Sequence, residues 1–179
     1  MKTEFKAKFL QHVAKRKKEG GFTLIELLVV IIIIGILSAI ALPSFLNQAN
    51  KAKESEAKQY LSAINKGQQA AYTEFGQFNT DINALGVGIK TETENYKYEC
   101  AVGKAAVSCT AKAEDGAPLR DYLGHVYLVY VNDAESTSRS ILCQAKGPDK
   151  DLGIFQLGSI NAKNSDPTCE KANPKMEDV

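Results

Sequence analysis

Residues 20–35 read GGFTLIELLVVIIIIG. Between Lys18 and Lys51 the only ionisable side chains are Glu19 and Glu26, so Glu26 stands at the near edge of a long stretch without charge. An unpaired charge inside a bilayer costs about 2.5 to 3.5 kcal/mol on insertion scales, and such residues usually have a partner. No lysine or arginine follows Glu26 within helical reach. The stretch therefore predicts an apolar helix whose one carboxylate lacks a cation.

Cleavage of the chain would supply that cation. If the bond between Gly21 and Phe22 is cut, the new amine lies four residues from Glu26, one helical turn away. It can pair with this carboxylate or with Glu26 of a neighbouring chain. Residues 1–21 hold seven lysines and arginines against two glutamates and stay in the cytoplasm by the positive-inside tendency. We predict a basic leader that is removed and a following part that faces outward.

Residues 22–48 form the hydrophobic segment. Its part from Phe22 to Leu42 is roughly 32 Å long as a helix, which matches a bilayer core of about 30 Å. Two alternatives remain open. Residues 39–41, Ala-Ile-Ala, are similar to the small-x-small site at which an ordinary secretory signal is cut, and the segment could also be an uncut membrane anchor. The glutamate within the apolar run and the long region before it argue against a secretory signal.

A second helical pattern runs from Ala49 to Phe78. Gly76 is a stop signal, and Pro43, which lacks a backbone donor, should kink or loosen the helix near residues 39–43. The apolar residues recur at three-, four- and seven-residue intervals, which predicts one buried face made of Ala57, Leu61, Ile64, Ala71, Phe75 and Phe78. The opposite, polar face is predicted to hold Lys53, Glu54, Lys58, Asn65 and Lys66.

Beyond Phe78 the helical period fades and glycines punctuate short runs, which predicts strands and loops. The predicted strands are residues 96–100, 107–111, 125–131, 139–145 and 154–157. The first two form a hairpin around Gly103, and 125–131 reads as a central strand. His125 is expected to be a partly buried structural histidine and not a base. The tail, residues 161–179, is predicted to be a loop tied at Cys169 and loose beyond it.

Four cysteines, Cys100, Cys109, Cys143 and Cys169, lie beyond the apolar segment, and their even number suits an oxidising compartment. Spacing favours Cys100 with Cys109 across the hairpin and Cys143 with Cys169 around a C-terminal loop, although four cysteines allow three pairings. No C-x-x-C occurs and the chain has only two histidines, so zinc and redox sites have little support. We predict neither a metal nor another cofactor.

The residues at the predicted cut resemble the signature of the type IV pilin family. That signature is a glycine before the scissile bond, a methylated phenylalanine after it and a glutamate four residues further on; here they are Gly21, Phe22 and Glu26. The likeness is specific across residues 20–43. Residues 49–78 look most like cyanobacterial type IV pilins, and beyond them the likeness is only architectural.

The resemblance implies how the chain would be processed. In that family a membrane-embedded aspartyl peptidase removes the leader and methylates the new amine, and an assembly ATPase drives the subunits into a filament. Carried onto this chain, it implies that Phe22 is methylated, that Glu26 registers an incoming subunit and that the helix bends or melts near Pro43. The predicted bridge from Cys143 to Cys169 resembles the disulfide that closes the C-terminal region in many type IV pilins.

Charge and motifs give no support to other classes of function. After the leader the chain holds 22 − 7 = 15 basic and 21 − 2 = 19 acidic residues, a net charge of −4. Phosphate contacts need clustered basic residues, so nucleic-acid binding is not readable here. No Walker motif, Rossmann fingerprint, G-x-S-x-G elbow or H-E-x-x-H occurs. We predict no enzymatic activity.

The expected fold is α+β, with a long N-terminal helix packed on a small antiparallel sheet and residues 49–179 as the globular head. The resemblance implies a self-polymerising subunit of a type IV pilus that is cut by prepilin peptidase, held in the inner membrane as a precursor and passed to the pilus assembly machinery. Its filament would be extracellular and serve motility, adhesion and DNA uptake. The alternatives are a type II secretion pseudopilin, a minor pilin of the same filament and, more remotely, a secreted or membrane-anchored binding protein.

Overall fold

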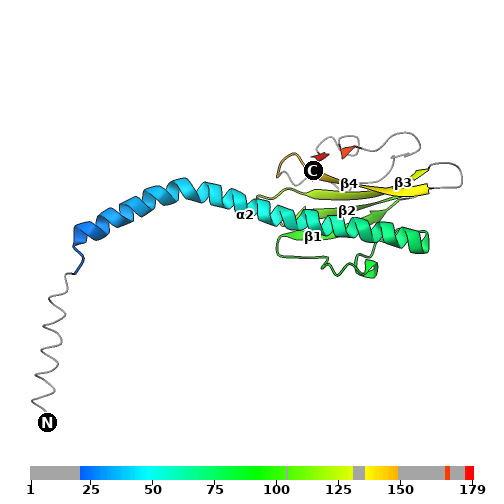
Figure 1. The fold of residues 1–179 in the computed structure, drawn as a ribbon, viewed down its shortest axis with the longest axis horizontal. Coiled ribbons are helices and arrows are strands. Elements are labelled where there is room, and N and C mark those ends of the chain that lie inside the picture. Colours follow the sequence, from blue (N-terminus) through cyan, green and yellow to red (C-terminus); the bar gives the residue numbers. More distant parts are fainter. Residues whose placement is uncertain (1–20, 104, 131–135, 149–167, 170–175) are drawn as a thin grey trace, which may run out of the picture. The chain divides into compact units, whose positions relative to one another are not determined.

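The computed structural model describes residues 21–103, 105–130, 136–148, 168–169 and 176–179. In chain order its elements are the helix α2 (Leu24–Phe75), the short 3-10 helix η1 (Asn83–Leu85) and the strands β1 (Tyr96–Val102), β2 (Ala106–Ala113), β3 (Tyr122–Tyr130), β4 (Ser136–Ala145) and β5 (Met176–Asp178) (Figure 1). The chain divides into two compact units, Met1–Asn47 and Gln48–Val179. Most of the leader and the edge strand predicted at residues 154–157 lie outside the described residues.

In the first unit, the described element is the beginning of α2. Every residue from 21 to 47 is exposed. Many of them are β-branched, and β-branched residues have a modest helix propensity in water. A helix nevertheless pairs its backbone groups within the segment itself, which is what an apolar chain needs in lipid. Pro43 lies inside the helix, and the kink expected there stays a prediction.

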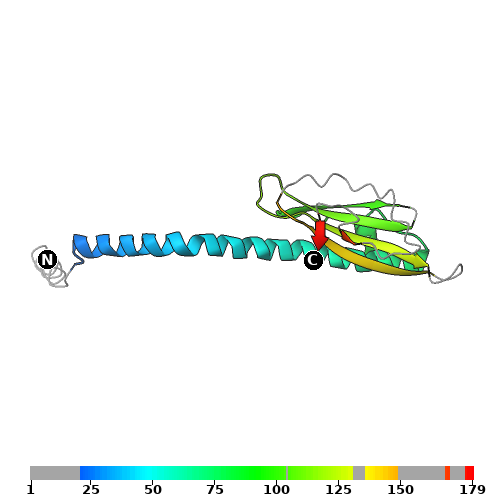
Figure 2. The same cartoon turned by 90° about the horizontal axis from the view of Figure 1, so that it is seen from above.

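In the second unit, the later part of α2 lies along one face of the sheet (Figure 1 and Figure 2). Ala57, Leu61 and Ile64, spaced four and three residues apart, are completely buried. This spacing places them on one side of the helix. They pack in one core with buried residues of three strands, namely Tyr96, Tyr98, Val107, Cys109, Ala111, Ala113, Tyr122 and Val126. The predicted arrangement of a helix on a sheet is confirmed.

The sheet is antiparallel throughout and its strand order is β1-β2-β3-β4-β5. β1 and β2 form the predicted hairpin, in which Cys100 lies opposite Cys109. β3 is the central strand, as predicted, and seven of its nine residues are buried. Since side chains alternate between the faces of a strand, both faces of β3 must be covered.

The face of the sheet opposite α2 carries a second, smaller core. Leu123 of β3, Cys143 of β4, Cys169 and Met176 of β5 are buried together, with Ile141 packed against them. We call these five residues the outer cluster. It is separate from the core under α2, so the sheet is stabilised from two sides.

Part of the predicted helix face was wrong. α2 ends at Phe75, and Gly76 follows it in the left-handed conformation (φ 69°), its N–H donating to the carbonyl of Tyr72 at 2.9 Å. This confirms the stop at Gly76 and leaves Phe78 outside the helix, where its ring stacks on Tyr72 with 4.9 Å between centroids. Phe75 is 71% exposed. Glycine fits this ending because, without a Cβ, it adopts the left-handed conformation with no steric clash.

Ala71 is only half-buried, and the buried face of α2 contains two polar residues that were not expected there. Gln68 is completely buried, because its side chain donates to the carbonyl of Asn79 at 2.5 Å and accepts from the N–H of Asn79 at 2.9 Å. Asn65, predicted on the polar face, is also buried and donates to the carbonyl of Ile141 at 3.3 Å. Periodicity could not reveal this, since the partners are remote in sequence.

The tail was predicted to be loose beyond Cys169, and this was wrong for its last residues. β5 pairs with β4, placing Met176 opposite Ala145. Met176 is buried in the outer cluster, and Glu177 accepts hydrogen bonds from Arg120 at 3.3 Å and Gln144 at 2.8 Å. Met176 is an isolated apolar residue without alternating apolar neighbours, so the local sequence did not predict this strand.

Candidate functional site at the start of helix α2

The bond between Gly21 and Phe22 lies just outside α2. Residues 21–23 are not helical, and the helix begins at Leu24. The Phe22 side chain is 81% exposed, and no atom lies within 4 Å of the place that a Cβ on Gly21 would take. Cleavage requires backbone that is free of helical hydrogen bonds and open to an enzyme. As far as the described residues show, the predicted scissile bond meets both conditions.

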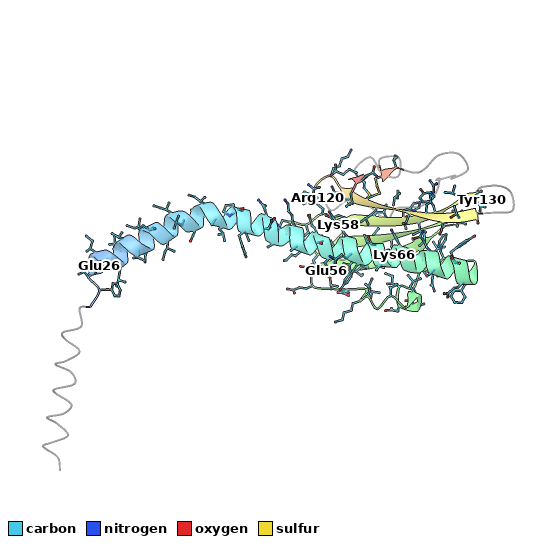
Figure 3. All side chains as sticks on the ribbon, in the orientation of Figure 1. Glu26, Glu56, Lys58, Lys66, Arg120 and Tyr130 are labelled. Atoms are coloured by element: carbon cyan, nitrogen blue, oxygen red, sulfur yellow. A yellow bond between two sulfur atoms is a disulfide. The ribbon has the colours of Figure 1, made fainter. Side chains whose placement is uncertain are left out.

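Thr23 and Glu26 form a reciprocal cap at the first turn of α2. One oxygen of the Glu26 carboxylate accepts from the Thr23 backbone N–H at 2.8 Å and from the Thr23 hydroxyl at 2.9 Å. The Thr23 Oγ1 accepts in return from the Glu26 N–H at 3.3 Å. This is a capping box, in which two otherwise unpaired donors at the helix start are satisfied. Figure 3 marks Glu26 in this first turn.

Sequence reasoning missed the role of Thr23. It treated Glu26 as a carboxylate without a partner until cleavage creates an amine, whereas in the uncut chain the carboxylate already has two donors from Thr23. The signal was present, because threonine followed three residues later by glutamate and then by an apolar run is the sequence signature of this cap. Within the described part of the chain no lysine or arginine forms an ion pair with Glu26.

The apolar surface behind this cap is unusually large. Its exposed hydrophobic side chains are Phe22, Leu24, Ile25, Leu27, Leu28, Val29, Val30, Ile31, Ile32, Ile33, Ile34, Ile36, Leu37, Ile40, Leu42, Phe45 and Leu46. α2 is the one described helix that is long and apolar enough to cross a membrane, judged by length and composition alone. Soluble monomers rarely expose contiguous apolar patches beyond a few hundred Å². This surface is therefore suited to lipid or to other helices of its kind.

The second unit contains two disulfides in the pairing that the spacing favours. Cys100 and Cys109 are joined across the hairpin with their Cα atoms 4.0 Å apart. Cys143 and Cys169 are joined 26 residues apart, with a Cα separation of 5.6 Å. The Asp178 carboxylate lies near the second bridge. These three groups do not make a metal site, because a sulfur in a disulfide is not the thiolate that binds a metal.

The fold and this site together define a class of protein. Its members have an exposed apolar N-terminal helix that begins at a processing signature and continues onto a small antiparallel sheet. Residues 54–169 match the family model described as type IV pilin-like G and H. Residues 16–42 match the prokaryotic N-terminal methylation motif.

The first match covers 116 of 179 residues, which is more than half of the chain. The chain therefore belongs to the type IV pilin-like family. The match continues through the sheet to residue 169, so the likeness beyond Phe78 is one of sequence as well as architecture. The likeness of residues 49–78 to cyanobacterial pilins stays a prediction.

Curated relatives carry pilin names. The chain is 37% identical over 102 residues to the type IV major pilin protein PilA of Myxococcus xanthus, which covers 57% of this chain and 45% of that protein. It is 35% identical over 102 residues to the type IV major pilin protein PilE of Neisseria gonorrhoeae, covering 54% and 59%. The type II secretion system core protein G of Pseudomonas aeruginosa is 42% identical over 50 residues, covering 28% and 35%. This chain spans about half the length of the pilin relatives.

Proposed function

We propose that this chain is a structural subunit of a type IV pilus and has no enzymatic activity. The start of α2 carries the argument. There the exposed bond between Gly21 and Phe22 is followed by the cap of Glu26 on Thr23 and by an apolar helix with no covering residues among those described. The methylation motif and the pilin names of the relatives support the same proposal.

The proposed division of the chain follows from this. Residues 1–21 are a leader removed by a prepilin peptidase, and Phe22 becomes the methylated N-terminus. Residues 22–48 hold the precursor in the inner membrane and later pack in the filament core. Residues 49–179 are the head. The division of the structure into units after Asn47 supports a boundary close to this place.

Polymerisation then follows from the hydrophobic effect. Bringing the apolar helices of many copies together keeps them out of water after they leave the bilayer, and burial contributes about 25 cal/mol per Å² of apolar surface. Each buried Glu26 then needs a cation, and the Phe22 amine of the same or a neighbouring copy supplies it. The proposed partners are other copies of this chain, a prepilin peptidase, the pilus assembly machinery and, before assembly, the inner membrane. The proposed product is an extracellular filament serving motility, adhesion and DNA uptake.

The likeness to a type II secretion core protein keeps a pseudopilin as the second candidate. The experiment that separates the two is to shear surface filaments from cells and determine the N-terminal residue of this chain by peptide mass spectrometry. We expect an N-methylated Phe22 start in abundant long fibres. A Phe22 start in a chain absent from sheared fibres would favour the pseudopilin or a minor pilin. A start at Leu42, or an intact Met1 in the membrane fraction, would overturn the proposal.

A further inference from the structure

His125 is a titratable side chain that the proposed assembly does not use. It lies in the middle of β3 on the face of the sheet that carries the outer cluster, opposite Ser108 of β2 and Ile141 of β4. Its side chain is 1% exposed and its ring stacks on Tyr127 with 5.6 Å between centroids. The residue therefore sits against the cluster that holds the C-terminal disulfide.

The burial of His125 favours the neutral ring. Its Nδ1 lies 2.8 Å from the Ser108 Oγ, and its Nε2 is buried with no hydrogen-bond partner in the structure as described. In either neutral tautomer the ring has one donor and one acceptor nitrogen, whereas the protonated ring has two donors. Protonation would thus add a charge to a buried ring, which is costly in a low-dielectric interior.

Among the described residues, no carboxylate interacts with His125 in a way that would compensate for protonation. In the part of the chain that the structure describes, strand register places the titratable side chains of Tyr127 on β3 and Arg139 on β4 next to His125 on this face, opposite each other. Ser108 and Ile141 carry no charge. The described carboxylates on the same face have other partners: Glu99 pairs with Lys97 at 3.0 Å, Asp121 accepts from the Ala113 N–H at 2.7 Å and Asp178 accepts from the Cys169 N–H at 3.4 Å. Burial lowers the pKa of His125 to about 4, and a hydrogen bond to the Val107 backbone, which favours the protonated ring, opposes this only in part.

We infer that His125 makes the outer face of the sheet acid-sensitive, so that mild acid opens the outer cluster and exposes the Cys143–Cys169 disulfide while the core under α2 stays closed. Ile141 links the two, because it lies opposite His125 and packs in the outer cluster. When the outer face opens, the histidine regains its ordinary affinity for protons. The open population should therefore rise about thirtyfold between pH 7.5 and pH 5.

The test measures how fast each disulfide is reduced by a water-soluble phosphine in the full chain in detergent micelles. The phosphine is oxidised to its oxide with oxygen from water, and the S–S bond takes up two electrons and two protons to give two thiols. Samples are quenched and alkylated, and each pair is followed by peptide mass spectrometry. Each reduction rate is divided by the rate for oxidised glutathione at the same pH, which removes the pH dependence of the phosphine itself. The Cys100–Cys109 disulfide, which lies in the core under α2, is the internal reference.

We expect the normalised rate for Cys143–Cys169 to rise about thirtyfold from pH 7.5 to pH 5, with little change at Cys100–Cys109. The His125→Gln variant keeps a partner for Ser108 but cannot titrate, and it should abolish this rise. Ser108→Ala is the matched control, since it removes the hydrogen bond and leaves the imidazole, so the rise should persist. If His125→Gln does not fold, His125→Phe, which can still stack on Tyr127, replaces it.

Three results would overturn the inference. The first is a normalised rate in the unaltered chain that does not change with pH. The second is the same rise in a His125 variant, which would assign it to another group. The third is an equal rise at both disulfides, which would mean that the whole head opens together. None of these depends on whether the chain forms a pilus.

Discussion

At the scale of single residues, Glu26 has one observed role and one proposed role. Its oxygen accepts hydrogen bonds from Thr23, and we propose that its charge pairs with a cation in the filament. The first role needs only an acceptor, so a glutamine side chain could fill it. The second needs the ionised carboxylate, because charge-assisted pairs are the stronger ones in a dry environment. Substitutions that keep one role and remove the other can therefore tell which one assembly requires.

We predict that Glu26→Gln and Glu26→Ala both leave membrane insertion and leader cleavage intact and both reduce sheared pili by at least about tenfold, the effect of losing 1.4 kcal/mol. Glutamine preserves the acceptor for Thr23, so a matching defect in both variants would assign the requirement to the charge. Immunoblots of the membrane fraction and of sheared filaments measure the two steps. Normal filaments from Glu26→Gln together with few from Glu26→Ala would instead assign it to the cap.

His125 gives the head a defined dependence of stability on pH. Its pKa in the folded chain is lowered to about 4, below the value of about 6.5 in an unfolded chain. Between these values the unfolded state binds more protons, so this stabilising contribution is complete above pH 6.5 and is lost as the pH falls toward 4. Urea unfolding should show that the free energy of unfolding drops by about 2 kcal/mol more in the unaltered chain than in His125→Gln between pH 7.5 and pH 5. Equal losses in the two proteins would contradict this.

At the scale of elements, α2 and the sheet are held together by a close fit as well as by apolar burial. Gly124 of β3 lies beneath Asn65 of α2. A Cβ added at Gly124 would come within 2.6 Å of the Asn65 Oδ1 and 3.1 Å of its Cγ. The amide also donates to the carbonyl of Ile141. Helix and strand therefore meet at a site where a side chain on the strand would displace the Asn65 amide.

We predict that Gly124→Ala destabilises the head by about 1 to 3 kcal/mol, the usual cost of overpacking a core. Asn65→Ala removes the three atoms nearest to the new methyl group, so the double variant should recover part of the loss. The coupling free energy from urea unfolding of the four proteins in a double-mutant cycle measures this. Strictly additive effects would show that the two side chains do not share the space.

At the scale of the whole molecule, the two disulfides constrain the unfolded chain to different degrees. The Cys143–Cys169 bridge closes 26 residues and attaches Cys169 to the sheet, whereas Cys100–Cys109 closes 9 residues within one hairpin. Loop-closure entropy grows with the logarithm of loop length. The longer loop should therefore contribute more to stability.

Replacing both cysteines of a pair by serine should cost about 3.5 kcal/mol for Cys143 with Cys169 and about 2.6 kcal/mol for Cys100 with Cys109, according to the chain-entropy relation. Thermal unfolding of the two double variants beside the unaltered protein measures the difference. A larger loss from the hairpin pair would mean that packing in the core under α2 outweighs loop entropy.

The sequence by itself determined the features that follow from local rules. The apolar run of the right length gave the start of α2, the period of Ala57, Leu61 and Ile64 gave its buried face, Gly76 gave its end, and alternation gave the hairpin with Cys100 opposite Cys109. Each of these features depends on residues close to one another in sequence, so the local pattern predicts it. The cap of Glu26 on Thr23 belongs here too, although it was overlooked.

Only the tertiary structure decided what depends on residues remote in sequence. It placed Asn65 against Gly124, joined Gln68 to Asn79 by hydrogen bonds, buried His125 between Ser108 and Ile141, and paired β5 with β4. In each case a polar or isolated side chain is buried because a specific distant partner satisfies it or because neighbouring elements enclose it. The local sequence pattern cannot predict that partner, since burial is a property of the packed chain and not of the single residue.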